Sequence, residues 1–196
     1  NNNYYLNAIE DDGDDILTSE SKLNMMKFPV AGSAQTYDST SFCPDSASTA
    51  TSISTGHKTY SEQSIWMRRW RPPMRPSQKT EKQLGYKVGI LSSVNLNHAT
   101  PAAFYAHQAS RNSYYEIGEE LIASDFDYFA GGGLKKTTGA DGDKTDLYQL
   151  AEEAGYKVIK TQAEAESLTA EDGKAIVIDE TLADSDAMSY DMDREE

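Results

Sequence analysis

Residues 44–56 read Pro-Asp-Ser-Ala-Ser-Thr-Ala-Thr-Ser-Ile-Ser-Thr-Gly, so Asp45 and Ser46 stand directly before a run of small side chains. A serine at this place predicts a nucleophile in the first turn of a helix, where backbone N–H groups and the helix dipole stabilise an alkoxide or a phosphate. Small side chains would also let the helix pack close to a sheet. A serine hydroxyl needs a base or a metal ion for activation. Taken alone, the pattern is more often a capped helix or a low-complexity stretch.

Strand and helix patterns alternate after this stretch. Short apolar runs between turn residues predict strands, and apolar residues at helical spacing predict amphipathic helices. The predicted strands are residues 88–93, 126–130, 158–159 and 175–178, and the predicted helices are residues 113–124, 145–154 and 163–168. Strands that alternate with helices indicate an α/β fold with a largely parallel sheet.

The bulk composition limits the possible partners. A chain of 196 residues predicts one domain, and its net charge of −14 argues against nucleic acid as a partner. A phosphate site in so acidic a chain needs local cations. No apolar run approaches the ~20 residues of a membrane helix, and the first residues do not have the pattern of a signal peptide. The single cysteine, Cys43, excludes an internal disulfide framework.

A basic segment at about residues 63–80 differs from its surroundings. It has no acidic residue, yet it contains five basic residues, both tryptophans (Trp66 and Trp70) and three prolines. One interpretation is a basic, aromatic loop that recognises an anionic partner. An irregular loop is a second interpretation, and a locally shifted reading frame in the source gene is a third.

Four segments, in this order, carry a resemblance to a known family. They are residues 45–59 (DSASTATSISTGHKT), residues 97–103 (NHATPAA), residues 106–112 (AHQASRN) and the predicted strand that ends in Gly131-Gly132-Gly133-Leu134. They resemble the nucleophile signature, the second motif, the arginine segment and the following strand of alkaline phosphatases. Residues 22–37 resemble the approach to the nucleophile. The resemblance implies an alkaline-phosphatase-like α/β fold, in which residues 1–196 form part of one domain and part of a largely parallel central sheet flanked by helices.

The resemblance also implies a hydrolase that acts on phosphate monoesters through a phosphoserine intermediate. Ser46 would attack phosphorus, and Arg111 would bind two phosphate oxygens as a planar donor, which a lysine cannot replace. Asp45 would orient Arg111 and take part in substrate binding. Thr100 would offer its hydroxyl to a magnesium site, and His98 would tune that metal from the outer sphere. Without the resemblance, a threonine before a proline is ordinarily extended backbone.

Ligands for zinc are the residues of the family site that this chain is least expected to supply. The family uses two zinc ions and a magnesium ion, with an aspartate ligand in a Gly-Asp-Gly-Met-type strand end and further ligands in its second half. No such motif precedes Leu23, and the chain ends at Glu196, so the zinc ligands are largely absent. Neutral oxygens of Ser46 and Thr100 could not hold zinc alone. We therefore expect very low phosphatase activity from this chain by itself. The family also implies a periplasmic or secreted location and a homodimer.

Other interpretations are less consistent with the residues. A related sulfatase would carry a Cys/Ser-x-Pro-x-Arg motif, and a related phosphodiesterase commonly uses a threonine nucleophile. A non-catalytic fragment that binds anionic ligands through the basic segment is a further alternative. The acidic residues 11–15 and 141–146 suggest calcium, but the second cluster lacks the glycine of an EF-hand loop, so solvated turns are predicted. His57 and His107 are interpreted as structural.

Overall fold

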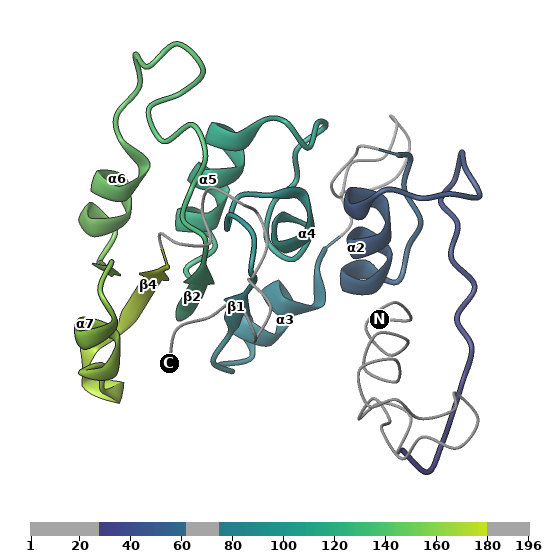
Figure 1. Ribbon diagram of the computed structural model, residues 1–196, viewed down its shortest axis with the longest axis horizontal. Helices are drawn as coiled ribbons and strands as arrows, with labels where there is room; N and C mark the ends of the chain where they lie inside the picture. Colours follow the sequence, from purple (N-terminus) through teal and green to yellow (C-terminus); the bar gives the residue numbers. More distant parts are fainter. Residues whose placement is uncertain (1–27, 62–74, 180–196) are drawn as a thin grey trace, which may run out of the picture. The chain divides into compact units, whose positions relative to one another are not determined.

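The computed structural model describes residues 28–61 and 75–179 (Figure 1). The chain divides into two units, residues 1–35 and residues 36–196. The described part of the first unit, residues 28–35, contains no helix or strand. All helices and strands named below belong to the second unit. Residues 63–74 of the basic segment, the first acidic cluster and residues 22–27 of the family resemblance lie outside the described residues.

The sheet has four parallel strands. They are β1 (Gly89–Leu91), β2 (Tyr128–Gly131), β3 (Tyr156–Ile159) and β4 (Lys174–Ile178), in the order β1-β2-β4-β3. Ile90, Phe129, Ile176 and Val158 lie side by side across the sheet. The predicted α/β class and parallel sheet are thereby confirmed, although β1 is shorter than the predicted strand at residues 88–93, and β2 begins and ends later than the one predicted at residues 126–130.

Helices are interleaved with these strands. The helices are α2 (Ser46–Thr55), α3 (Ser77–Gln83), α4 (Ala99–Ala102), α5 (Tyr114–Ala123), α6 (Leu147–Glu153) and α7 (Gln162–Glu166), with a short 3₁₀ helix, η2, at Ala170–Asp172. The predictions for α5, α6 and α7 are confirmed. Asp146 caps α6, because its carboxylate accepts a hydrogen bond from the Tyr148 N–H. No helix in the described ranges is long and apolar enough to cross a membrane.

Two helices depart from the sequence predictions. Residues 77–80 belong to α3, so the irregular-loop interpretation is wrong for that end of the basic segment. Thr100 lies in the first turn of α4 and not in extended backbone. Pro101 has no backbone N–H, and it is tolerated there because an N–H in the first turn has no partner within the helix.

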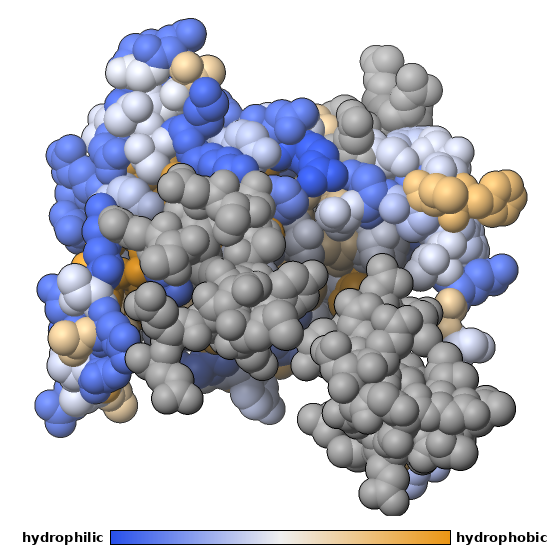
Figure 2. Space-filling model, in the orientation of Figure 1, coloured by the Kyte–Doolittle hydropathy of each residue, from blue (hydrophilic) through white to orange (hydrophobic). Residues whose placement is uncertain are grey.

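Aromatic side chains fill the core between the sheet and its helices. The ring of Phe129 packs edge-on against Tyr105 and parallel to Phe126, with ring centroids 5.7 and 6.1 Å apart. The described surface on the face in Figure 2 is mostly hydrophilic, as the acidic composition leads one to expect. Within the second unit, a buried hydrogen bond links α2 to the end of α4: the Ser54 hydroxyl donates to the Ala103 carbonyl at 2.6 Å. This contact holds α2 beside α4.

Asp127, just before β2, should make the fold sensitive to acid. Its side chain is 15% exposed and accepts hydrogen bonds from Lys82, Lys87 and the Val88 N–H. Burial raises the pKa of the carboxyl, but these donors outweigh burial and lower the pKa from 3.8 to about 2. Because the folded pKa lies below the unfolded one, this stabilisation is present above about pH 4 and is lost as the pH falls toward 2.

We expect Asp127→Asn to lower the free energy of unfolding by about 1–2 kcal/mol at pH 7, with the difference from the wild type disappearing near pH 2. Urea titrations at several pH values measure this difference. Asp141→Asn, which changes an exposed carboxylate, is the matched control and should have little effect. A difference for Asp127→Asn that does not change with pH would contradict the assignment.

Candidate active site

The predicted nucleophile turn is the first turn of α2. Ser46 is the first helical residue and is exposed, and Asp45 is the N-cap. Asp45 Oδ1 accepts hydrogen bonds from the Ser48 N–H at 2.9 Å and from the Ser48 hydroxyl at 2.7 Å. At the other end, Gly56 closes the helix with a φ of 73°, a left-handed conformation that favours glycine. The sequence therefore produces a well-capped helix that presents Ser46 at its positive end.

Arg111 comes from a distant segment to meet this turn. Its Nη1 donates to Asp45 Oδ2 at 3.0 Å, and the two side chains are 23% and 20% exposed. Its Nη2 lies 3.4 Å from His98 Nε2. A guanidinium can only donate, so this imidazole nitrogen acts as the acceptor and carries no proton in that contact. Arg111 thus lies between His98 and Asp45, and Asp45 directly precedes Ser46 in the chain.

Asp38 is a neighbour of the site that sequence reasoning missed. It is buried, and burial raises the pKa of its carboxyl, but hydrogen bonds from Ser61, Thr40 and Ser41 outweigh burial and lower the pKa to about 2. An aspartate followed by serine and threonine is a signal for a local turn. That signal does not reveal that the carboxylate is buried.

The sequence of this chain matches a known protein family. The model of the alkaline phosphatase family matches residues 6–196. The chain belongs to the alkaline phosphatase family. The resemblance inferred from the motifs is thereby confirmed.

Individual alkaline phosphatases match over a shorter part of their own length. The tissue-nonspecific alkaline phosphatase of Rattus norvegicus is 32% identical over 162 residues, which cover 69% of this chain and 30% of the rat protein. The alkaline phosphatase structure from the Antarctic bacterium TAB5 aligns with a TM-score of 0.70 and 28% identity, over 82% of this chain and 46% of that one. A variant of the TAB5 protein, with the same TM-score, identity and coverage, was solved with magnesium bound in its M3 site. This chain therefore spans less than half of these relatives.

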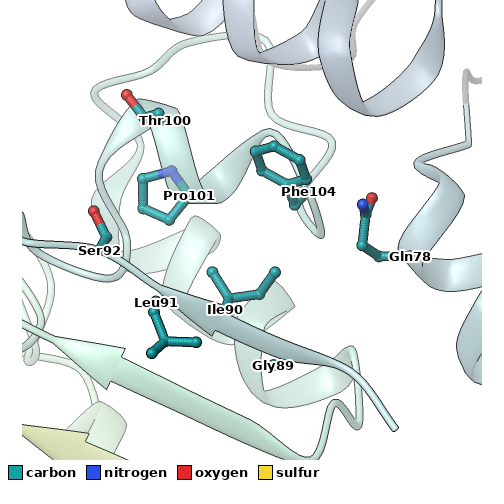
Figure 3. Close-up of a pocket in the computed structure, with 8 residues that line it drawn as sticks. All are labelled: Gln78, Gly89, Ile90, Leu91, Ser92, Thr100, Pro101 and Phe104. Atoms are coloured by element: carbon teal, nitrogen blue, oxygen red, sulfur yellow. The ribbon is translucent and has the colours of Figure 1, made fainter. Parts of the chain in front are cut away.

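A cavity of about 250 Å³ in this alkaline phosphatase chain lies among α3, β1 and α4 (Figure 3). Its lining consists of Gln78, Gly89, Ile90, Leu91, Ser92, Thr100, Pro101 and Phe104. Figure 3 shows Thr100 at one end and Gln78 at the other, with apolar side chains between them. Ser46, Asp45 and Arg111 are not part of the lining. We therefore place the candidate site at the contact between Arg111 and Asp45 and not in the cavity.

Metal ligands are the part of an alkaline phosphatase site that the described residues do not supply. Within residues 28–61 and 75–179, no group of three or more His, Cys, Asp or Glu side chains could hold a metal ion. Zinc, which takes four such ligands in closed protein sites, does not fit here. Thr100 is exposed in α4, and it offers only a neutral hydroxyl oxygen.

The remaining histidines and acidic residues have other contacts or face solvent. His107 Nδ1 lies 3.1 Å from Glu120 Oε2, and its backbone N–H donates to the same oxygen at 2.8 Å. His57 is exposed just after α2. In the second acidic cluster, residues 141–145 are exposed and Asp146 caps α6, which agrees with the predicted solvated turn.

Proposed function

We propose that this chain carries the phosphate-binding and nucleophile part of a phosphate-monoester hydrolase, with Ser46 as the residue that becomes phosphorylated. The observation that supports it most is the Arg111–Asp45 ion pair at the positive end of α2, beside an exposed serine. Family membership supports the same assignment. Formation of a homodimer and an exported location belong to this proposal too, and they rest on family membership alone.

In the proposed reaction, two groups of donors bind the substrate phosphate. The first-turn N–H groups of α2 face one side of it. Arg111 uses one nitrogen for Asp45 and has other N–H groups, out of five, for the phosphate oxygens. The Ser46 hydroxyl then gives its proton to solvent as its oxygen attacks phosphorus. The ester P–O bond breaks, and the alcohol leaves with a proton from solvent. Water hydrolyses the phosphoserine and releases phosphate.

Activation of the Ser46 hydroxyl is the step for which this chain supplies the fewest groups. Within the described residues, no side chain forms a hydrogen bond with the Ser46 hydroxyl, so we assign it no general base there. The described residues also do not assemble a zinc site. We propose Thr100 as one oxygen ligand of a magnesium ion and His98 as an outer-sphere group, without deriving a step from that ion. The chain by itself should therefore bind phosphate but hydrolyse phosphate esters only very slowly.

The test separates binding from turnover in the 196-residue protein. We expect ³¹P NMR to show saturable binding of inorganic phosphate. We also expect very slow hydrolysis of p-nitrophenyl phosphate when Zn²⁺ and Mg²⁺ are added. Ser46→Ala should abolish whatever turnover exists and leave phosphate binding within about threefold of the wild type, because Arg111 supplies the main charge. Ser52→Ala, on the same helix, is the control. Turnover that survives in Ser46→Ala contradicts the assigned nucleophile, and fast turnover that Ser46→Ala abolishes contradicts the predicted low activity.

A further inference from the structure

Asp38 joins three pieces of the chain through one buried carboxylate, with only 4% of the residue exposed. Its Oδ1 accepts hydrogen bonds from the N–H and hydroxyl of Thr40, at 2.7 and 2.9 Å, and from the Ser41 N–H at 2.6 Å. Its Oδ2 accepts from the Ser61 hydroxyl and lies 3.3 Å from the Ser48 hydroxyl. Asp38 therefore connects its own turn, the start of α2 and the residues that follow α2.

The Ser48 hydroxyl lies between two carboxylates. It is 3.3 Å from Asp38 Oδ2 and 2.7 Å from Asp45 Oδ1. The hydroxyl has one proton, which it shares between the two carboxylates, chiefly with Asp45 at the shorter distance. Ser48 is fully buried, so bulk water does not compete for this proton. Asp38 thus helps to hold the Ser48 hydroxyl, and that hydroxyl, together with the Ser48 N–H at 2.9 Å, holds the Asp45 carboxylate.

We propose that Asp38 is a positioning residue for Arg111, acting through the Ser48 hydroxyl and the Asp45 carboxylate. Asp45 uses Oδ1 for Ser48 and Oδ2 for Arg111, so a rotation of its carboxylate changes both contacts together. Bidentate binding of phosphate requires one guanidinium orientation. The catalytic value of this positioning rests on the proposed function, in which Arg111 binds the substrate, but the positioning itself can be observed without substrate.

Asp38→Asn should preserve the positioning. The amide oxygen can accept from the N–H groups of the turn, and the amide NH₂ can donate to the hydroxyl oxygens of Ser48 and Ser61. The Ser48 proton then remains with Asp45. Shape and connectivity are retained while one negative charge is removed.

Asp38→Ala and Ser48→Ala should each loosen Arg111, although the N–H of residue 48 still donates to Asp45 Oδ1 in both variants. Asp38→Ala removes the whole anchor, including its turn contacts, whereas Ser48→Ala removes only the link between the two carboxylates. Ser52→Ala is the matched control, because the Ser52 hydroxyl donates to the Ser48 carbonyl at 3.0 Å on the same helix and reaches neither carboxylate.

The experiment observes the guanidinium in the full 196-residue protein by ¹⁵N NMR of the arginine side chains, with the Arg111 signal assigned by its loss in Arg111→Lys. Hindered rotation gives separate Nη–H signals for a held guanidinium and averaged signals for a released one. We expect separate signals in the wild type, Asp38→Asn and Ser52→Ala, and averaged signals in Asp38→Ala and Ser48→Ala. The dissociation constant for inorganic phosphate should rise about tenfold in the last two variants and stay within about twofold in the others.

The outcomes distinguish this inference from the proposed function. Averaged Arg111 signals in the wild type, or separate signals in a folded Ser48→Ala protein, overturn the positioning role. Circular dichroism reports folding, and Ser48→Ala decides the case if Asp38→Ala unfolds. A wild type that holds Arg111 but does not bind phosphate contradicts the proposed function and leaves the positioning role standing.

Discussion

Gly131→Ala is expected to lower the free energy of unfolding by about 3 kcal/mol, because the position has no room for a methyl group. A Cβ at residue 131 would lie 2.5 Å from the Ser92 carbonyl oxygen and 3.0 Å from that of Val94. Both are backbone atoms that cannot rotate away as a side chain would. The connection after β1 is also held in place, since the Gly132 N–H donates to the Val94 carbonyl at 3.1 Å.

Gly89→Ala provides the matched control on the neighbouring strand. A Cβ at Gly89 would meet its nearest atoms at 3.6–3.8 Å, which is ordinary contact. Neither glycine has a positive φ, so backbone strain does not distinguish them. Urea denaturation followed by circular dichroism should show a change below about 0.5 kcal/mol for Gly89→Ala. Equal losses for the two variants would mean that the close approach at Gly131 is not the cause.

The strand and helix pattern could be predicted because it depends on neighbouring residues. The apolar runs around Ile90, Phe129 and Ile176 are local, and each of these three buried residues lies in a strand. The glycine turn after β2 was predicted as a strand end. Its tight contact with the Ser92 and Val94 carbonyls was not, because it depends on how two strands pair.

The short helices α3 and α4 could not be predicted for the same reason. α4 contains a proline, and the residue before a proline ordinarily avoids helical conformation. Burial of Ala99, Pro101 and Ala102 against the core holds that turn in place. Tertiary packing thus determines the conformation where the local preference points the other way.

Some residues of the candidate site could be predicted from motifs, and others became apparent only from contacts in the structure. Ser46, Asp45 and Arg111 carry motifs, and the structure places the Arg111 and Asp45 side chains in contact across 66 residues of sequence. Their roles in a reaction stay predictions. Asp38 carries no motif, and its importance comes from contacts with Ser48 and other residues that are distant in sequence.

Arg111→Lys should weaken binding of inorganic phosphate by about 10- to 100-fold, or about 1.5–3 kcal/mol. Lysine keeps the positive charge, so long-range attraction to the anion is almost unchanged. It loses the planar fork that can pair with Asp45 and with phosphate oxygens at the same time. The loss therefore measures geometry and not charge. Isothermal titration calorimetry or ³¹P NMR can follow it in the 196-residue protein.

Arg75→Lys is the matched control for this change, because Arg75 is exposed ahead of α3 and carries the same charge. We expect its phosphate affinity to stay within about twofold of the wild type. Added salt should weaken binding in all three proteins through screening. It should leave the ratio between wild type and Arg111→Lys nearly constant, since both carry the same net charge. An equal loss in both variants, or a ratio that salt removes, would show that general electrostatics and not the Arg111 fork binds the anion.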